Sequence, residues 1–177
     1  MQNLSEKQWY AIRVTYNREM LVKRDLTAKH IEHFLPMKHV VEMRGERKIK
    51  VLKPAINNLI FIYASAEYLK EYKETTALPI RYIMNHETKK PLVIPTKQMQ
   101  DFIAVAGTQH EQLIYLEPDM SNFSKGDRVR VTGGVFNGAE GLFMRIKGDR
   151  RVVVCIPGIA AVATAFIHPS LVEKIAE

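Results

Sequence analysis

Residues 123–141 read FSKGDRVRVTGGVFNGAEG, and this stretch decides the fold of the C-terminal part of the chain. Gly126-Asp127 is a turn signal, and the alternating residues 127–131 predict a strand. Gly133-Gly134 closes that strand, and two more glycines follow Phe136. Because glycine turns corners that a Cβ would block, this spacing predicts the entry to a small, strongly bent β-barrel.

The chain continues after this stretch as strands and turns. Apolar stretches at residues 142–146, 152–156 and 162–167 predict three more strands, with a turn at Gly148–Arg151. Residues 123–177 are therefore predicted to form the barrel domain. Residues 108–122 mix Gln, Glu, Pro, Asp and Ser, and we interpret them as a linker that holds at most one docking strand.

The N-terminal part contains both the alternating pattern of strands and the helical spacing of apolar residues, which indicates an α+β domain spanning residues 1–107. We expect an antiparallel sheet with packed helices, and a helix capped by Asn17 that runs to about Ile31. The predicted strands are residues 9–14, 34–41, 48–52, 59–63 and 80–84, and the other predicted helices are residues 66–75 and 95–106.

Composition narrows the class of protein. The 177 residues carry a net charge of +7, which favours polyanionic partners, although solubility alone also explains such an excess. A single cysteine, Cys155, permits no internal disulfide, and residues 1–8 show no signal-peptide core. No run of eighteen apolar residues exists, which excludes a transmembrane helix. Because the single cysteine favours a reducing compartment, we expect a cytoplasmic protein with no membrane partner.

Signals of catalysis are missing from the sequence. It shows no phosphate-binding loop, no dinucleotide-binding turn and no nucleophile elbow. His30 and His33 have a spacing that suits a metal, but no third ligand completes a site. We therefore expect a protein that is not an enzyme and has no cofactor or metal.

The run Leu59–Tyr63 is apolar at every position. A sheet with helices on one face should alternate instead. Two interpretations remain open, namely a central strand buried on both faces or an exposed apolar patch that binds a partner.

The glycine-rich stretch resembles the KOW motif, and the N-terminal part resembles the NusG N-terminal domain. The second likeness rests on Trp9-Tyr10, Phe34–Met37, Lys53–Ile62, Pro79–Ile83 and Pro91–Pro95. Together they span about residues 8–175 and resemble NusG-like transcription elongation and antitermination factors. The order Ile56-Asn57-Asn58-Leu59 departs from the Phe-Pro-Gly-Tyr of the general factor and looks closer to RfaH and UpxY-type paralogues.

This resemblance implies three contact sites. The clamp helices of RNA polymerase would bind Tyr10, Leu59, Phe61 and Tyr82, and Phe61→Asp is expected to abolish binding in a folded domain. Non-template DNA would contact Arg13, Tyr16, Asn17, Arg18, Lys23 and Arg24, although helix capping and surface charge explain this cluster equally well. A small-subunit ribosomal protein or the termination factor Rho would bind the barrel rim at Ile156, Ile159 and Val162, residues that packing against the N-terminal domain also explains.

The function implied is suppression of pausing or termination at particular operons, with the second partner recruited through the barrel. The alternative is a KOW-containing RNA-binding or ribosome-associated protein. It predicts RNA affinity in the barrel, whereas the apolar Leu59–Tyr63 run favours a protein partner.

Overall fold

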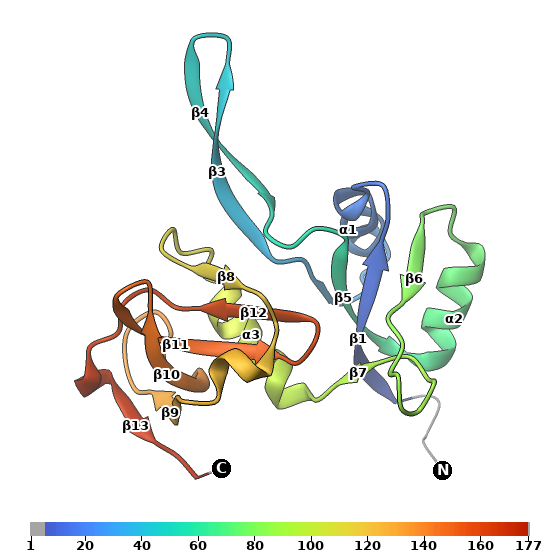
Figure 1. The fold of residues 1–177 in the computed structure, drawn as a ribbon. Coiled ribbons are helices and arrows are strands. Elements are labelled where there is room, and N and C mark those ends of the chain that lie inside the picture. Colours follow the sequence, from blue (N-terminus) through green and yellow to red (C-terminus); the bar gives the residue numbers. More distant parts are fainter. Residues whose placement is uncertain (1–5, 177) are drawn as a thin grey trace. The chain divides into compact units, whose positions relative to one another are not determined.

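The computed structural model describes residues 6–176. Residues 1–5, which form part of the segment without a signal-peptide core and begin the first predicted domain, lie outside the described residues, as does residue 177 at the end of the second predicted domain. Three helices combine with antiparallel sheets, which confirms the predicted α+β class (Figure 1). The chain divides into two compact units. One contains the residues up to Pro36 together with Ile56–Thr96, and the other contains Met37–Ala55 together with the residues from Lys97.

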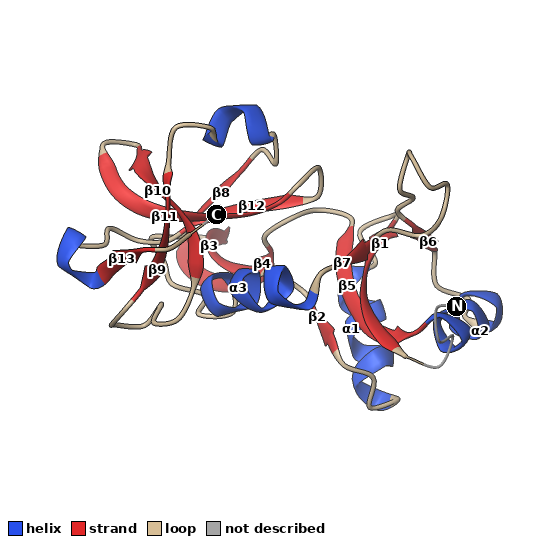
Figure 2. Ribbon diagram, turned by 90° about the horizontal axis from the view of Figure 1, so that it is seen from below, coloured by secondary structure: helices blue, strands red, loops and turns tan. Residues whose placement is uncertain are grey.

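The first unit is built on a five-stranded antiparallel sheet. Its order is β2 (His33–Phe34), β5 (Leu59–Ser65), β1 (Lys7–Val14) and β6 (Ile80–Tyr82), and β7 (Val93–Ile94) also pairs with β1. Helices α1 (Glu19–Ala28) and α2 (Ala66–Thr75) accompany this sheet, and Figure 2 draws them in blue beside the red strands.

Both helices lie on one face of the sheet. Tyr82 is the cross-strand partner of Ile12, and the Lys73 ammonium of α2 lies 5.6 Å from the centroid of the Tyr82 ring. The Tyr72 hydroxyl of α2 donates a hydrogen bond to Asp25 of α1 at 2.7 Å, which ties the two helices together. Beneath them lies an apolar core that includes Ile12, Val14, Val22, Leu26, Ile60, Ile62 and Leu69.

The opposite face of the sheet is buried as well. Trp9, Ala11, Leu59 and Phe61 share it by strand register, and none is more than 5% exposed. Of the two interpretations of the apolar run, the structure therefore agrees with the strand that is buried on both faces.

The start of α1 differs from the expectation. The N-cap position is Arg18, which makes no side-chain cap, while Asn17 precedes it with a left-handed φ of 53°. The Glu19 carboxylate instead turns inward and accepts the main-chain N–H of Asn58 at 2.6 Å. That bond satisfies a donor on the loop before β5 and ties the start of α1 to this loop.

A long hairpin joins β3 (Met37–Arg44) to β4 (Arg47–Pro54), coloured cyan in Figure 1. The predicted strand over residues 34–41 is broken, because Leu35-Pro36 separates β2 from β3 and a proline has no N–H for the ladder. Gly45 makes the tip with a positive φ of 62°, a conformation that glycine adopts without steric cost.

The second unit contains a six-stranded antiparallel sheet of the KOW barrel type, which confirms the predicted fold. Its order is β13 (Val172–Lys174), β9 (Asp127–Val131), β10 (Glu140–Ile146), β11 (Asp149–Ile156), β12 (Ala160–Ala163) and β8 (Ile114–Leu116), with short 3₁₀ turns at Met120–Phe123 and Pro169–Leu171. A Cβ at Gly141 would overlap the carbonyl oxygen of Val153, so glycine is required where β10 crosses β11.

Helix α3 (Thr96–Ala106) belongs almost entirely to this second unit. Its Asp101 is 4% exposed and accepts both the Lys97 ammonium at 2.7 Å and the main-chain N–H of Glu140 at 3.2 Å. The predicted domains place this helix before the linker, and those domain boundaries stay a prediction.

Candidate functional site

A cationic cluster surrounds the end of β1 and the start of α1. Of the residues predicted to contact DNA, only Lys23 is half-buried and the others are exposed: Arg13, Tyr16, Asn17, Arg18 and Arg24. Among residues 6–176, no carboxylate forms an ion pair with the four cations of this cluster. The acids of α1 are engaged elsewhere, Glu19 with Asn58 and Asp25 with Lys29 and Tyr72. The cluster therefore presents uncompensated positive charge to solvent.

Backbone conformation holds an aromatic side chain outward beside these cations. Tyr16 and Asn17 are consecutive residues in the left-handed region, with φ of 60° and 53°. Tyr16 is 81% exposed. It borders a hollow of about 410 Å³ that is also lined by Arg18, Leu21 and residues 77–79. An exposed ring next to free guanidinium groups can stack on an unpaired base.

The four residues predicted to bind polymerase lie on two faces of the sheet. Tyr10 and Tyr82 share the face that the helices cover, because they neighbour Ile62 and Ile12 in register. Leu59 and Phe61 point to the opposite face. Tyr10, Leu59 and Phe61 are at most 4% exposed, and Tyr82 alone is half-buried.

Because of this placement, the Phe61→Asp variant no longer tests polymerase binding by a folded domain. Phe61 is fully buried, and a carboxylate there would lose its hydration without gaining a partner. We now expect that variant to unfold the sheet, because its charge falls in the core rather than on a surface.

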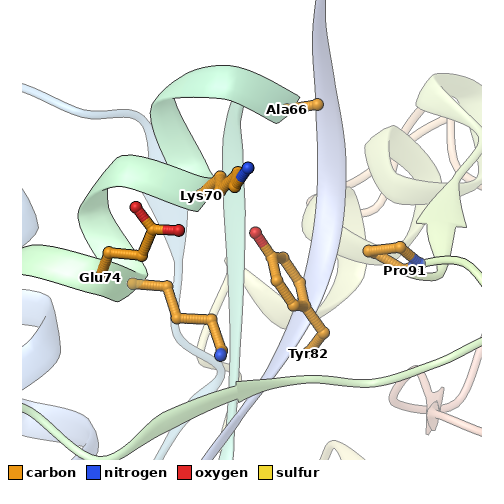
Figure 3. Close-up of a pocket in the computed structure, with 6 residues that line it drawn as sticks. Ala66, Lys70, Glu74, Tyr82 and Pro91 are labelled. Carbon is orange, nitrogen blue, oxygen red and sulfur yellow. The ribbon is translucent and has the colours of Figure 1, made fainter.

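A second hollow, of about 400 Å³, lies between α2 and the strand that carries Tyr82 (Figure 3). The Tyr82 ring extends towards the helix, and Ala66, Lys70, Lys73, Glu74 and Pro91 line the rest. Burial, then the neighbouring Tyr10 and Glu74, raise the pKa of Tyr82, so its hydroxyl is a donor at neutral pH. Lys70, Lys73 and Glu74 are not among the site residues predicted from the sequence, although their spacing places them on one face of a helix.

The predicted contacts on the barrel rim differ in exposure. Ile156 is 2% exposed and Val162 is fully buried, whereas Ile159 is half-buried beside the exposed Pro157-Gly158. Larger apolar surface lies elsewhere on this unit, where Val135 is 68% and Phe166 is 53% exposed. No periodic pattern marks those two positions in the sequence.

A model of the family described as transcription termination factor NusG matches residues 7–103. The chain belongs to the NusG family. That match spans the sheet and both helices of the first unit, together with the hairpin and most of α3. NusG-family proteins are transcription elongation and termination factors rather than enzymes, and RNA polymerase is the kind of partner that they bind.

A solved structure titled "Domain interaction in Thermotoga maritima NusG" is 20% identical, covers 98% of this chain and 100% of its own, and superposes with a TM-score of 0.47. Comparison with curated protein sequences gave no match.

Within residues 6–176, no group of three His, Cys, Asp or Glu side chains is arranged to hold a metal ion. Burial raises the pKa of the Cys155 thiol to about 11, which keeps it protonated and a poor nucleophile. No helix in the described part of the chain is long and apolar enough to cross a membrane.

Proposed function

We propose that the protein binds RNA polymerase through its first unit and suppresses pausing or termination during elongation. The observation that carries this proposal is the family match over residues 7–103, which includes every strand of the first sheet. Binding the elongating state of polymerase more tightly than the paused state shifts the population towards elongation. The protein needs no catalytic group to do this.

The polymerase contact is proposed to involve Tyr82 and the hollow beside it. Of the four polymerase candidates, Tyr82 is the one that combines an aromatic ring with surface for a partner. Lys70 and Lys73 add positive charge around the ring, and Pro91 adds an apolar wall. Such a mixture suits the end of a helix that carries both apolar and acidic side chains.

The cationic cluster is proposed to contact the exposed non-template DNA strand. Its free charges supply affinity, and Tyr16 supplies a stacking surface for a base. A strand contact of this kind favours a factor specialised for particular operons.

The barrel is proposed to recruit a second protein, either a small-subunit ribosomal protein or Rho, through the half-buried Ile159. The alternative function, RNA binding by the barrel, is disfavoured at β9, where both arginines are paired with acids. Glu140 lies 3.6 Å from Arg128 and 2.9 Å from Arg130, and Arg130 also pairs with Glu173 at 2.9 Å. Cations that are already paired offer little to a phosphate backbone.

The test is retention of the purified protein on an assembled elongation complex. Tyr82→Ala is expected to weaken binding by about tenfold, the loss that one contact at the centre of an interface typically causes. Phe166→Ala removes an exposed aromatic ring from the other unit and serves as the control. Equal affinity of the Tyr82→Ala and unchanged proteins would refute the placement of the contact.

A further inference from the structure

The hairpin of β3 and β4 has apolar side chains on both faces, and only one face is sheltered. Cross-strand partners project from the same face of a ribbon, so the register assigns every side chain to a face. The first face carries Val40, Ile49 and Val51, which are half-buried. The second, which we call the open face, carries six side chains that are all exposed: His39, Val41, Met43, Lys48, Lys50 and Leu52.

The apolar part of the open face is large for a surface. Val41 is 66%, Met43 is 60% and Leu52 is 41% exposed. A two-stranded hairpin is marginally stable in water unless one of its faces packs against another element. Aliphatic side chains that gather on one exposed face mark a site of interaction. The open face therefore has the composition of a docking surface.

The charges of the hairpin are divided unequally between its faces. Residues 37–54 hold six Lys or Arg and two Glu, and neither acid lies on the open face. Glu42 shares the first face with Lys53 and pairs with it, and Glu46 lies in the turn. Lys48 of the open face forms no ion pair with a carboxylate of residues 6–176. The open face therefore combines aliphatic and cationic side chains and has no acid of its own.

One acid from elsewhere in the second unit already contacts this face. Glu111, which precedes β8, forms an ion pair with Lys50. The Glu111 side chain is 65% exposed, and an ion pair so open to water contributes little, so a partner can displace it. The contact shows the chemistry that the open face accepts, namely a carboxylate beside its lysines.

Composition and charge separate the candidate occupants of the open face. Residues 37–54 contain no aromatic side chain, so the hairpin offers no ring on which an unpaired base can stack. A second copy of this chain would bring the same cations against the face, and like charges in an interface cost free energy. The exposed groups lie on the face of the ribbon rather than along its edges, and a helix is the element that covers the face of a sheet.

We propose that the open face binds an amphipathic helix of a protein partner, one whose apolar stripe is flanked by acidic residues. The stripe covers Val41 and Met43, which lie about 7 Å apart along β3, close to the rise of about 6 Å between helix residues i and i+4. The flanking acids pair with Lys48 and replace Glu111 at Lys50. This site goes beyond the proposed function, because it contains none of the residues proposed to contact polymerase, DNA or Rho.

The experiment measures binding of designed peptides to the full chain by fluorescence anisotropy. The acidic probe is a fluorescein-labelled peptide of about 18 residues, five turns of helix, with leucines on one face and glutamates beside them. A second peptide has lysines in place of the glutamates, and a third has the composition of the first in an order without an apolar stripe. The protein should bind the acidic probe at least about tenfold more tightly than either of the other peptides.

A pair of serine substitutions tests the aliphatic surface. V41S/M43S should weaken binding of the acidic probe about tenfold or more. The matched control is V135S/M120S, which removes an exposed valine and an exposed methionine from another part of the same unit and should bind like the unchanged protein. All four positions are exposed, so both variants should melt close to the unchanged protein.

Charge variants test the pairing with acids. K48E should weaken binding about tenfold, whereas K125E, a reversal at another exposed lysine, should leave it within about twofold. Glu111→Gln frees Lys50 and should tighten binding about two- to fivefold, a gain that misfolding cannot produce. Its control is Glu117→Gln, which removes an exposed acid just after β8 and should bind like the unchanged protein.

Three results would overturn the proposal: equal binding of the three peptides, equal affinity of V41S/M43S and the unchanged protein, or no gain in Glu111→Gln. Vesicles of phosphatidylcholine and phosphatidylserine in equal parts and a labelled DNA duplex are tested alongside. If V41S/M43S loses binding to either of these while the acidic probe does not bind at all, the open face serves a membrane or a nucleic acid and the helix site is refuted. Retention on an elongation complex is a separate measurement, so the proposed function and this site can fail independently.

Discussion

Replacing Glu19 with alanine is expected to destabilise the first unit and disturb the cationic cluster. Glu19 is 3% exposed, and its carboxylate accepts the main-chain N–H of Asn58 at 2.6 Å. Removing the acceptor leaves a buried donor unsatisfied, which costs about 1.5–3 kcal/mol for a bond to a charged group. The acid also sits in the first turn of α1, where its interaction with the helix dipole contributes about 0.3–1 kcal/mol. The expected loss is therefore about 2–4 kcal/mol of the free energy of unfolding.

The assay is urea unfolding of the full chain followed by tryptophan fluorescence. The chain has one tryptophan, Trp9, which is 5% exposed on β1 and so reports on the first unit. Glu19→Gln is the matched control, because its amide oxygen still accepts the Asn58 N–H and only the charge is lost. We expect it to lose roughly half as much stability. A Glu19→Ala variant within about 0.5 kcal/mol of the unchanged protein would refute the reasoning, since that is the range of an ordinary surface substitution.

Three other predictions concern stability and reactivity. Hydrogen bonds from Tyr72 and then Lys29 hold the pKa of Asp25 below its ordinary value. The stabilising contribution of Asp25 is therefore complete above about pH 4 and is lost as the pH falls through the lowered pKa. In urea unfolding, Asp25→Asn should be less stable than the unchanged protein at about pH 6, and the difference should be smaller at about pH 3. Gly141→Ala should lower the free energy of unfolding by about 1–3 kcal/mol or prevent folding, because the added Cβ meets main-chain atoms of Val153. The control is Gly133→Ala, whose Cβ meets only the flexible end of a leucine side chain, so its melting temperature should be close to that of the unchanged protein. Iodoacetamide should modify Cys155 at least about tenfold more slowly than free cysteine at neutral pH, because the pKa of this thiol is raised to about 11; a rate like that of free cysteine would contradict its burial.

Local sequence signals predicted most of the fold. The turns around Gly126 and Gly148 and the alternation of residues 9–14 depend on neighbouring residues alone, so the strands that they delimit appear where expected. The ends of helices were predicted less reliably where a residue far away in the sequence supplies the hydrogen bond. The sequence predicts Asn17 as the cap of α1, but Arg18 occupies the N-cap position without a side-chain cap. Glu19 of the first turn instead accepts a hydrogen bond from Asn58, 39 positions away in the chain.

The candidate sites required information that the sequence does not contain. Tyr10 and Phe61 both belong to strands of the sheet, yet only the register shows that they point to opposite faces, since a shift of one residue would exchange them. The cationic cluster around residues 13–24 was visible because its members are neighbours in the chain.

The most direct test of the central claim is binding of the unchanged full chain to an elongation complex of RNA polymerase, compared with the same nucleic-acid scaffold without polymerase. We predict retention on the complex well above that on the bare scaffold, together with shorter pauses when nucleotides are added. A folded protein that binds the scaffold and the complex equally, and leaves pausing unchanged, would contradict the account.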